Sequence, residues 1–189
     1  MMSTVLCGKT IVLGVTGSIA AYKAAALARI LVKNGAAVRV VLTAAGAKFV
    51  TAQTFAALVG GHVYSEMFGE PPPVRAVHLA IPDGAHAVLV APASADFIGR
   101  LAGGLGDDLL AAVCLAATCP IVLAPAMHHQ MWANAFLQAN VARLVAHGVA
   151  MIGPARGELA GRDEGRGRMA EPEDIVAALQ EMLAERVTA

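Results

Sequence analysis

Short apolar runs that alternate with longer segments of helical periodicity constrain the fold of this chain more than any other feature. The runs at 10–16 (TIVLGVT) and 38–43 (VRVVLT) lack a regular exchange of apolar and polar residues, which is typical of strands buried on both faces. Further strands are expected at 87–91, 121–124 and about 150–153. Strands that alternate with helices form right-handed βαβ units. The sequence therefore predicts an α/β fold, a Rossmann-like doubly wound parallel sheet.

Helical periodicity fills the segments between these runs. Helices are expected at 19–34, 52–59, 95–101, 105–117, 129–147 and 173–186. Two segments break the pattern: the proline-rich 69–74 (GEPPPV) and the long, Gly-rich and polar 153–171. Long loops in compact domains often cover ligands. We therefore expect one domain over residues 1–189, with a substrate-covering loop at about 153–171.

Composition excludes several classes of protein. A hydrophobic content of 57 % and equal numbers of basic and acidic residues, 14 each, argue against disorder and against a nucleic-acid-binding surface. Residues 109–127 carry no charge, but Pro120 and Pro125 interrupt this alanine-rich stretch, so no membrane segment is expected. Residues 1–9 do not resemble a signal peptide, and three cysteines fit reduced thiols. These features predict a cytoplasmic protein.

The turn after the first predicted strand has the composition of an anion-binding site. Residues 14–18 (GVTGS) join that strand to a helix, and a helix N-terminus offers free N–H groups and a partial positive charge to a phosphate. The spacing is not that of the dinucleotide fingerprint. A plain turn in which Ser18 caps the helix is the alternative.

Polar residues follow other strands at the same edge of the predicted sheet, where ligands of open α/β sheets bind. Ser94 and Asp96 come after one strand and Thr43 after another, so the three could line a common crevice. Helix capping is the alternative for Ser94 and Asp96.

The segment 125–132 (PAMHHQMW) follows a further strand and contains the only tryptophan. Met127 and Met131 stand four residues apart, a spacing that more often reflects core packing. The pair His128 and His129 is a poor metal motif, because adjacent side chains are expected to face apart. We therefore expect no metal site. His78, after the proline-rich segment, becomes interesting only if it reaches the crevice that His128 faces.

These segments together resemble the flavoprotein family of cysteine decarboxylases, which includes phosphopantothenoylcysteine decarboxylases, Hal3-type proteins and decarboxylases of peptide C-terminal cysteines. The resemblance rests on six motifs in order along the chain: GVTGSIAAYK (14–23), VHL (77–79), APASAD (91–96), AGGLGDDLL (102–110), PAMHHQMW (125–132) and GRMAEP (167–172). Each motif is weak alone, but their order makes the resemblance specific over residues 8–176.

The resemblance implies FMN as cofactor and assigns roles residue by residue. The residues implied to contact the cofactor are Gly17, Ser18, Ile19, Thr43, Ala45, Ser94, Ala95, Asp96, Phe97 and Ala126. His78 matches the family's active-site histidine, and His128 stands where an asparagine commonly holds the substrate carboxylate. Met127 and Met131 keep their motif places beside the substrate.

The implied reaction is the FMN-dependent oxidative decarboxylation of a cysteine carboxylate. The favoured substrate is the C-terminal cysteine of a ribosomal peptide, which would give an aminoenethiol. This preference rests on Ala160, where many phosphopantothenoylcysteine decarboxylases have a cysteine, and on the chain's end at Ala189 without a fused ligase domain. The alternatives are a phosphopantothenoylcysteine decarboxylase of coenzyme A biosynthesis, giving 4′-phosphopantetheine, and a non-enzymatic Hal3-type subunit.

The same resemblance implies a homotrimer, or a dodecamer built from trimers, with FMN at the subunit interface. Only 15 % of the residues are charged and 4 % are aromatic, so a lone domain would have difficulty burying so much small apolar surface. Burial between subunits would account for part of that surplus.

Overall fold

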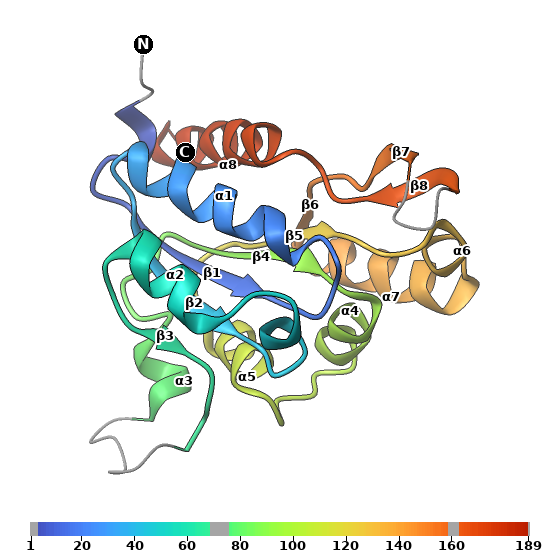
Figure 1. Ribbon diagram of the computed structural model, residues 1–189, viewed down its shortest axis with the longest axis horizontal. Helices are drawn as coiled ribbons and strands as arrows, with labels where there is room; N and C mark the ends of the chain where they lie inside the picture. The colour runs from blue at the N-terminus through green and yellow to red at the C-terminus, as the bar shows by residue number, and fades with distance from the viewer. Residues whose placement is uncertain (1–3, 69–75, 159–162, 189) are drawn as a thin grey trace.

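A computed structural model describes residues 4–68, 76–158 and 163–188, and its core is a six-stranded parallel sheet (Figure 1). The strand order is β3-β2-β1-β4-β5-β6. The strands are β1 (Thr10–Val15), β2 (Ala37–Leu42), β3 (Val63–Tyr64), β4 (Ala87–Ala93), β5 (Ile121–Pro125) and β6 (Ala150–Met151). The predicted doubly wound parallel sheet is confirmed. The short strand β3 was not predicted from the sequence.

Helices cover both faces of the sheet, which explains the apolar strands. One face packs against α1 (Ala21–Lys33), α2 (Ala52–Val59) and α8 (Pro172–Thr188). The other packs against α3 (Val77–Ala80), α4 (Ala95–Ala102), α5 (Leu109–Ala116) and α7 (Ala135–Ala146). Every residue of β4 is buried. If apolar and polar residues alternated along this strand, the polar side chains would be buried in one of the two apolar cores.

The strand order reverses direction at the boundary between β1 and β4. The chain leaves β1 for β2 on one side through α1, and it leaves β4 for β5 on the other side through α4 and α5. Connections that diverge in this way open a crevice at the carboxyl ends of the two strands, where ligands of such folds bind. The fold therefore places the turns after β1 and β4 side by side.

Two predicted segments differ from the structure. The single helix expected at 129–147 is divided into α6 (His129–Trp132) and α7, because the Asn134 side chain accepts a hydrogen bond from the Phe136 N–H and starts a new helix. Part of the loop expected at 153–171 forms the β7–β8 ribbon, an antiparallel pair of β7 (Ala155–Glu158) and β8 (Glu164–Arg168). Within the described residues, no helix is both long and apolar enough to cross a membrane.

Candidate functional site

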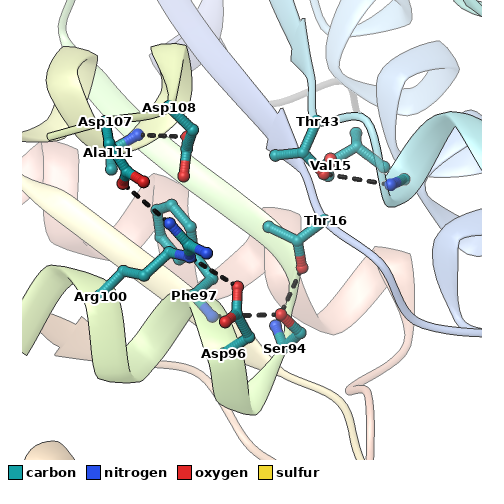
Figure 2. Close-up of polar contacts among 11 residues, drawn as sticks. Val15, Thr16, Thr43, Ser94, Asp96, Phe97, Arg100, Asp107, Asp108 and Ala111 are labelled. Carbon is teal, nitrogen blue, oxygen red and sulfur yellow. Dashed lines mark hydrogen bonds and ion pairs between the residues drawn. The ribbon is translucent and has the colours of Figure 1, made fainter. Parts of the chain in front are cut away.

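A buried threonine joins the ends of β1 and β4 at the switch point (Figure 2). The Thr16 hydroxyl donates to the Pro92 carbonyl at 2.7 Å and accepts from the Ser94 N–H at 2.9 Å. The residue is only 2 % exposed, so few waters can replace these bonds. Thr16 thus fixes the position of Ser94 relative to the turn that follows β1.

That turn leaves room and hydrogen-bond donors for a ligand. A Cβ on Gly17 would lie 2.6 Å from the Ala45 Cβ, so only glycine fits beside the loop after β2. The Ser18 hydroxyl accepts from the Ala20 N–H at 3.3 Å, so Ser18 caps the first turn rather than α1 itself. The N–H groups of Gly17 and Ile19 have no acceptor among the residues that the structure describes. This arrangement suits a phosphate group.

Ser94 and Asp96 begin α4 and are held by different contacts. Ser94 is the N-cap of this helix, and its hydroxyl accepts from the Phe97 N–H at 3.3 Å. The capping alternative therefore holds for Ser94. Asp96 pairs with Arg100 at 2.8 Å, and Arg100 also pairs with Asp107 at 2.8 Å (Figure 2). Hydrogen bonding by Arg100 lowers the pKa of the Asp107 carboxyl below its ordinary value.

The segment after β5 is packed against the β7–β8 ribbon. The Met127 N–H donates to the Gly167 carbonyl at 2.9 Å, and a Cβ on Gly167 would clash with the Met127 carbonyl oxygen. A Cβ on Gly165 would lie 2.5 Å from the Cβ of His129. The two glycines therefore let β8 lie directly against the start of α6, and β8 forms one wall of the site.

These turns and the ribbon enclose one cavity of about 830 Å³. The structure brings together eleven of the predicted site residues in its lining: Gly17, Ser18, Ile19, Ala45, Ser94, Ala95, Asp96, Ala126, Met127, His128 and Met131. The turns after β1, β4 and β5 thus lie around one cavity at the carboxyl edge of the sheet.

Three of the predicted site residues, Phe97, Thr43 and His78, do not line this cavity. Phe97 is buried in the core beneath α4, and Thr43 lines a second cavity of about 390 Å³. The Thr43 hydroxyl contacts the Val15 carbonyl at 3.2 Å and the Gly46 N–H at 3.1 Å, so it stabilises the loop after β2. Thr43 thus does not join Ser94 and Asp96 in one crevice, which corrects that expectation.

His78 does not line the cavity that His128 faces. It lies on the short helix α3, which packs against α5. Figure 1 shows α3 and α6 at opposite ends of the molecule. One copy of the chain therefore does not bring the two histidines together.

Sequence reasoning missed a charged group at the edge of the cavity. Lys23 on α1 is almost fully buried, and its Nζ lies 2.8 Å from Oε1 of Glu171. Arg168 on β8 reaches the same carboxylate at 2.6 Å. Hydrogen bonding by Lys23 lowers the pKa of the Glu171 carboxyl. Lys23 and Arg168 both line the cavity; the signal was available, because both belong to the quoted motifs.

The two adjacent histidines lie closer together than the sequence suggested. Their ring centroids are 4.2 Å apart, because His128 has an extended backbone as the N-cap of α6 while His129 is its first residue. The two side chains therefore do not face apart, and the prediction that they would is wrong. Ligand atoms of His128, His129 and Asp163 lie within 4.8 Å of one another.

Hydrogen bonding at His128 nevertheless disfavours a metal there. Its Nδ1 accepts from the Gln130 N–H at 3.3 Å, and its Nε2 lies 3.0 Å from Oδ2 of Asp163. A neutral imidazole whose Nδ1 accepts carries its proton on Nε2. The Nε2 atom that faces Asp163 therefore has no lone pair to offer a cation.

The cysteines lie away from the cavity. Cys7 is exposed, Cys114 is buried in α5 and Cys119 is partly buried, and none of them lines the cavity. Burial raises the pKa of the Cys114 thiol far above its ordinary value, so it stays protonated. Ala160, where many family members have a cysteine, lies outside the described residues.

The fold and the cavity define a doubly wound α/β protein with a site for a phosphorylated cofactor at its switch point. The family model described as Flavoprotein matches residues 2–184, and the chain belongs to this family. The resemblance found in the motifs is therefore confirmed.

Individual relatives and solved structures align with nearly the whole of this chain. It is 45 % identical over 181 residues to the coenzyme A biosynthesis bifunctional protein CoaBC of Haemophilus influenzae, covering 96 % of this chain but 45 % of that protein. The chain thus spans about half the length of this curated relative. Among solved structures, a PPC decarboxylase variant complexed with pantothenoylaminoethenethiol has a TM-score of 0.81 at 29 % identity, covering 92 % of this chain and 97 % of that one. The FMN-dependent cysteine decarboxylase SpaF has a TM-score of 0.81 at 26 % identity, covering 95 % and 98 %.

Proposed function

We propose that this chain is an FMN-dependent cysteine decarboxylase and that its substrate is phosphopantothenoylcysteine. The observation that supports the reaction type is the cavity of about 830 Å³, which joins the turn after β1, the start of α4 and the segment around His128. The substrate is supported by the CoaBC relative, which is 45 % identical over nearly the whole chain. The relatives thus favour phosphopantothenoylcysteine over the peptide substrate that the sequence had favoured.

The residues in the cavity fit FMN. The free amides of Gly17 and Ile19 suit its phosphate, and the room that Gly17 leaves beside Ala45 would be filled by any Cβ. Ser94, Ala95 and Ala126 would contact the rest of the cofactor. When bound, FMN would accept two electrons from the carbon that carries the substrate thiol.

This oxidation makes the carboxylate a leaving group. The carbon–sulfur double bond that it leaves on the substrate can accept the electron pair of the breaking carbon–carbon bond, so CO₂ departs and an enethiol forms. The protein's part is to hold the carboxylate. His128 lines the cavity and its Nδ1 accepts the Gln130 N–H, so a neutral ring would donate a hydrogen bond from Nε2 to that group. Met127 and Met131 would supply apolar contact.

We further propose that a second copy of the chain supplies His78 in a homotrimer or a larger assembly of trimers. His78 is remote from the cavity of its own chain, and apolar side chains stand exposed at the cavity rim, including Ile19, Tyr22 and Phe49. Such side chains are commonly buried in obligate interfaces. In this arrangement His78 would act as a base or orienting group near the thiol.

Co-expression of His78→Asn and His128→Ala variants tests the shared site. Each variant alone should lose turnover, whereas mixed oligomers should regain part of it, because some interfaces combine intact His78 with intact His128. Mixed oligomers that stay inactive while both variants bind FMN would contradict a shared site. A His78→Asn variant with full turnover would exclude any catalytic role for that histidine. A wild type that binds FMN but turns over neither substrate would support the non-enzymatic alternative.

Substrate identity is tested by mass spectrometry of products. The FMN-loaded protein is incubated separately with phosphopantothenoylcysteine and with a peptide that ends in cysteine. We expect net loss of CO₂ alone from phosphopantothenoylcysteine, because the two electrons taken up by the cofactor would return to the enethiol together with two protons. Loss of CO₂ and two hydrogens from the peptide, with no change in phosphopantothenoylcysteine, would refute the proposed substrate and favour a peptide. That second candidate is supported by the SpaF structure and by Ala160.

A further inference from the structure

The carboxylate of Asp163 already uses the hydrogen-bond donor that the proposed function assigns to the substrate. Asp163 directly precedes β8, and its Oδ2 lies 3.0 Å from the Nε2 of His128. His128 also lines the cavity. The side chains are 34 % and 58 % exposed for His128 and Asp163, so the contact sits where a ligand can replace it.

His128 has one donor to share. Its Nδ1 accepts the Gln130 N–H, and a proton on Nδ1 would break that bond and set two N–H groups against each other. The neutral ring therefore offers a single N–H, on Nε2. A carboxylate is a strong acceptor for this group, so Asp163 and a substrate carboxylate compete for it.

We propose that Asp163 is an internal competitor for the substrate carboxylate, which must displace the Asp163 side chain from His128 in order to bind there. This inference rests on the proposed role of His128 as carboxylate anchor. A ligand with an amide in that position offers a neutral, weaker acceptor and leaves the pair of His128 and Asp163 intact. The contact therefore weakens the binding of a carboxylate and leaves the binding of a neutral ligand unchanged.

Asp163→Asn removes the charge and keeps the shape, and Glu164→Gln is a matched control. Glu164 is the next residue, is exposed, and has no side-chain hydrogen bond or ion pair with any described residue. The probe is propionate, with propionamide as its uncharged counterpart. Binding to the FMN-loaded protein is followed through the NMR resonances of the His128 ring, so the readout does not depend on turnover.

Propionate should bind Asp163→Asn about twofold to fivefold more tightly than it binds the wild type or Glu164→Gln, because an exposed hydrogen bond to a carboxylate is worth about as much as an exposed ion pair. Propionamide affinity should not follow this change. For a substrate that the wild type turns over, KM should fall by the same factor with kcat unchanged, which a merely structural role would not produce.

Equal propionate affinity in the two variants, or weaker binding to Asp163→Asn, would overturn the competition. The proposed function fails by a separate result, namely no turnover of either cysteine substrate by the FMN-loaded wild type. The two failures are therefore distinguishable.

Discussion

Replacement of Thr16 by valine tests how the switch point is held together. The substitution keeps the branched shape of the side chain and removes its hydroxyl. Two hydrogen bonds between the ends of β1 and β4 are lost: the one to the Pro92 carbonyl at 2.7 Å and the one from the Ser94 N–H at 2.9 Å.

The expected cost follows from the partners that remain. The Pro92 carbonyl keeps a longer contact, 3.4 Å, with the backbone N–H of residue 16. The Ser94 N–H has no such second partner among the described residues, but it is only partly buried, so leaving it unsatisfied costs about 1 kcal/mol, the lower end of the range for buried donors. With the loss of one net hydrogen bond, worth about 1 kcal/mol, the free energy of unfolding should fall by about 2 kcal/mol.

Thr43→Val is the matched control, because Thr43 follows the adjacent strand β2 and also bridges two backbone groups (Figure 2). Its bonds are longer, water can reach them, and the Val15 carbonyl keeps the Thr43 N–H at 3.1 Å. We expect a loss of about 0.5–1 kcal/mol. Urea unfolding of the FMN-loaded proteins, followed by circular dichroism, measures both.

The Thr16→Val variant should also bind FMN more weakly. Gly17 and Ser94 both line the cavity, and the lost hydrogen bonds are the ones that hold the turn with Gly17 beside the turn with Ser94. A fluorescence titration of FMN measures this effect. Equal unfolding free energies for the two valine variants, within about 0.5 kcal/mol, would refute the assignment of Thr16 as the tie between the strands.

Four further substitutions test the walls of the cavity and the ion pair of Lys23 with Glu171. Gly17→Ala should abolish FMN binding in a titration, because the added Cβ would lie 2.6 Å from a neighbouring alanine methyl; retained affinity would contradict the tight turn. Gly167→Ala should reduce turnover by displacing β8, whereas Gly157→Ala, whose Cβ meets only ordinary contacts at 3.5 Å, should not; equal activities would contradict the role of the ribbon. The pKa of Glu171 is lowered in the folded protein, and the largest cause is the hydrogen bond from Lys23. Ionised Glu171 therefore stabilises the folded protein at pH values above its ordinary pKa of 4.5, and this stabilisation is lost as the pH falls through the lower pKa of the folded state. In acid unfolding, the Glu171→Gln variant should lack this pH-dependent part of the unfolding free energy.

Much of the fold could be predicted because the signals are local. The boundaries of α2 agree with the predicted 52–59, and the runs that form β1, β4 and β5 are apolar on both faces. The β7–β8 ribbon could not be predicted in this way, since its glycines, arginines and acidic residues are weak strand formers. It packs on α6 through two glycines, a contact between segments distant in sequence.

The site shows the same division. Gly17, Ser94 and His128 could be chosen from the sequence, because each follows a predicted strand and the carboxyl ends of parallel strands meet at one edge. Thr43 satisfies the same rule, yet it lines another cavity, because its hydroxyl is turned to the Val15 carbonyl and the Gly46 N–H.

The sequence by itself determined the class of fold, the family and the turns that line the cavity. Those properties follow from apolar periodicity and short motifs, which involve neighbouring residues. Only the tertiary structure decided that His78 lies away from its own chain's cavity, that Lys23 is buried against Glu171, and that Asp163 contacts His128. These placements depend on the packing of distant segments, whose geometry no local pattern encodes.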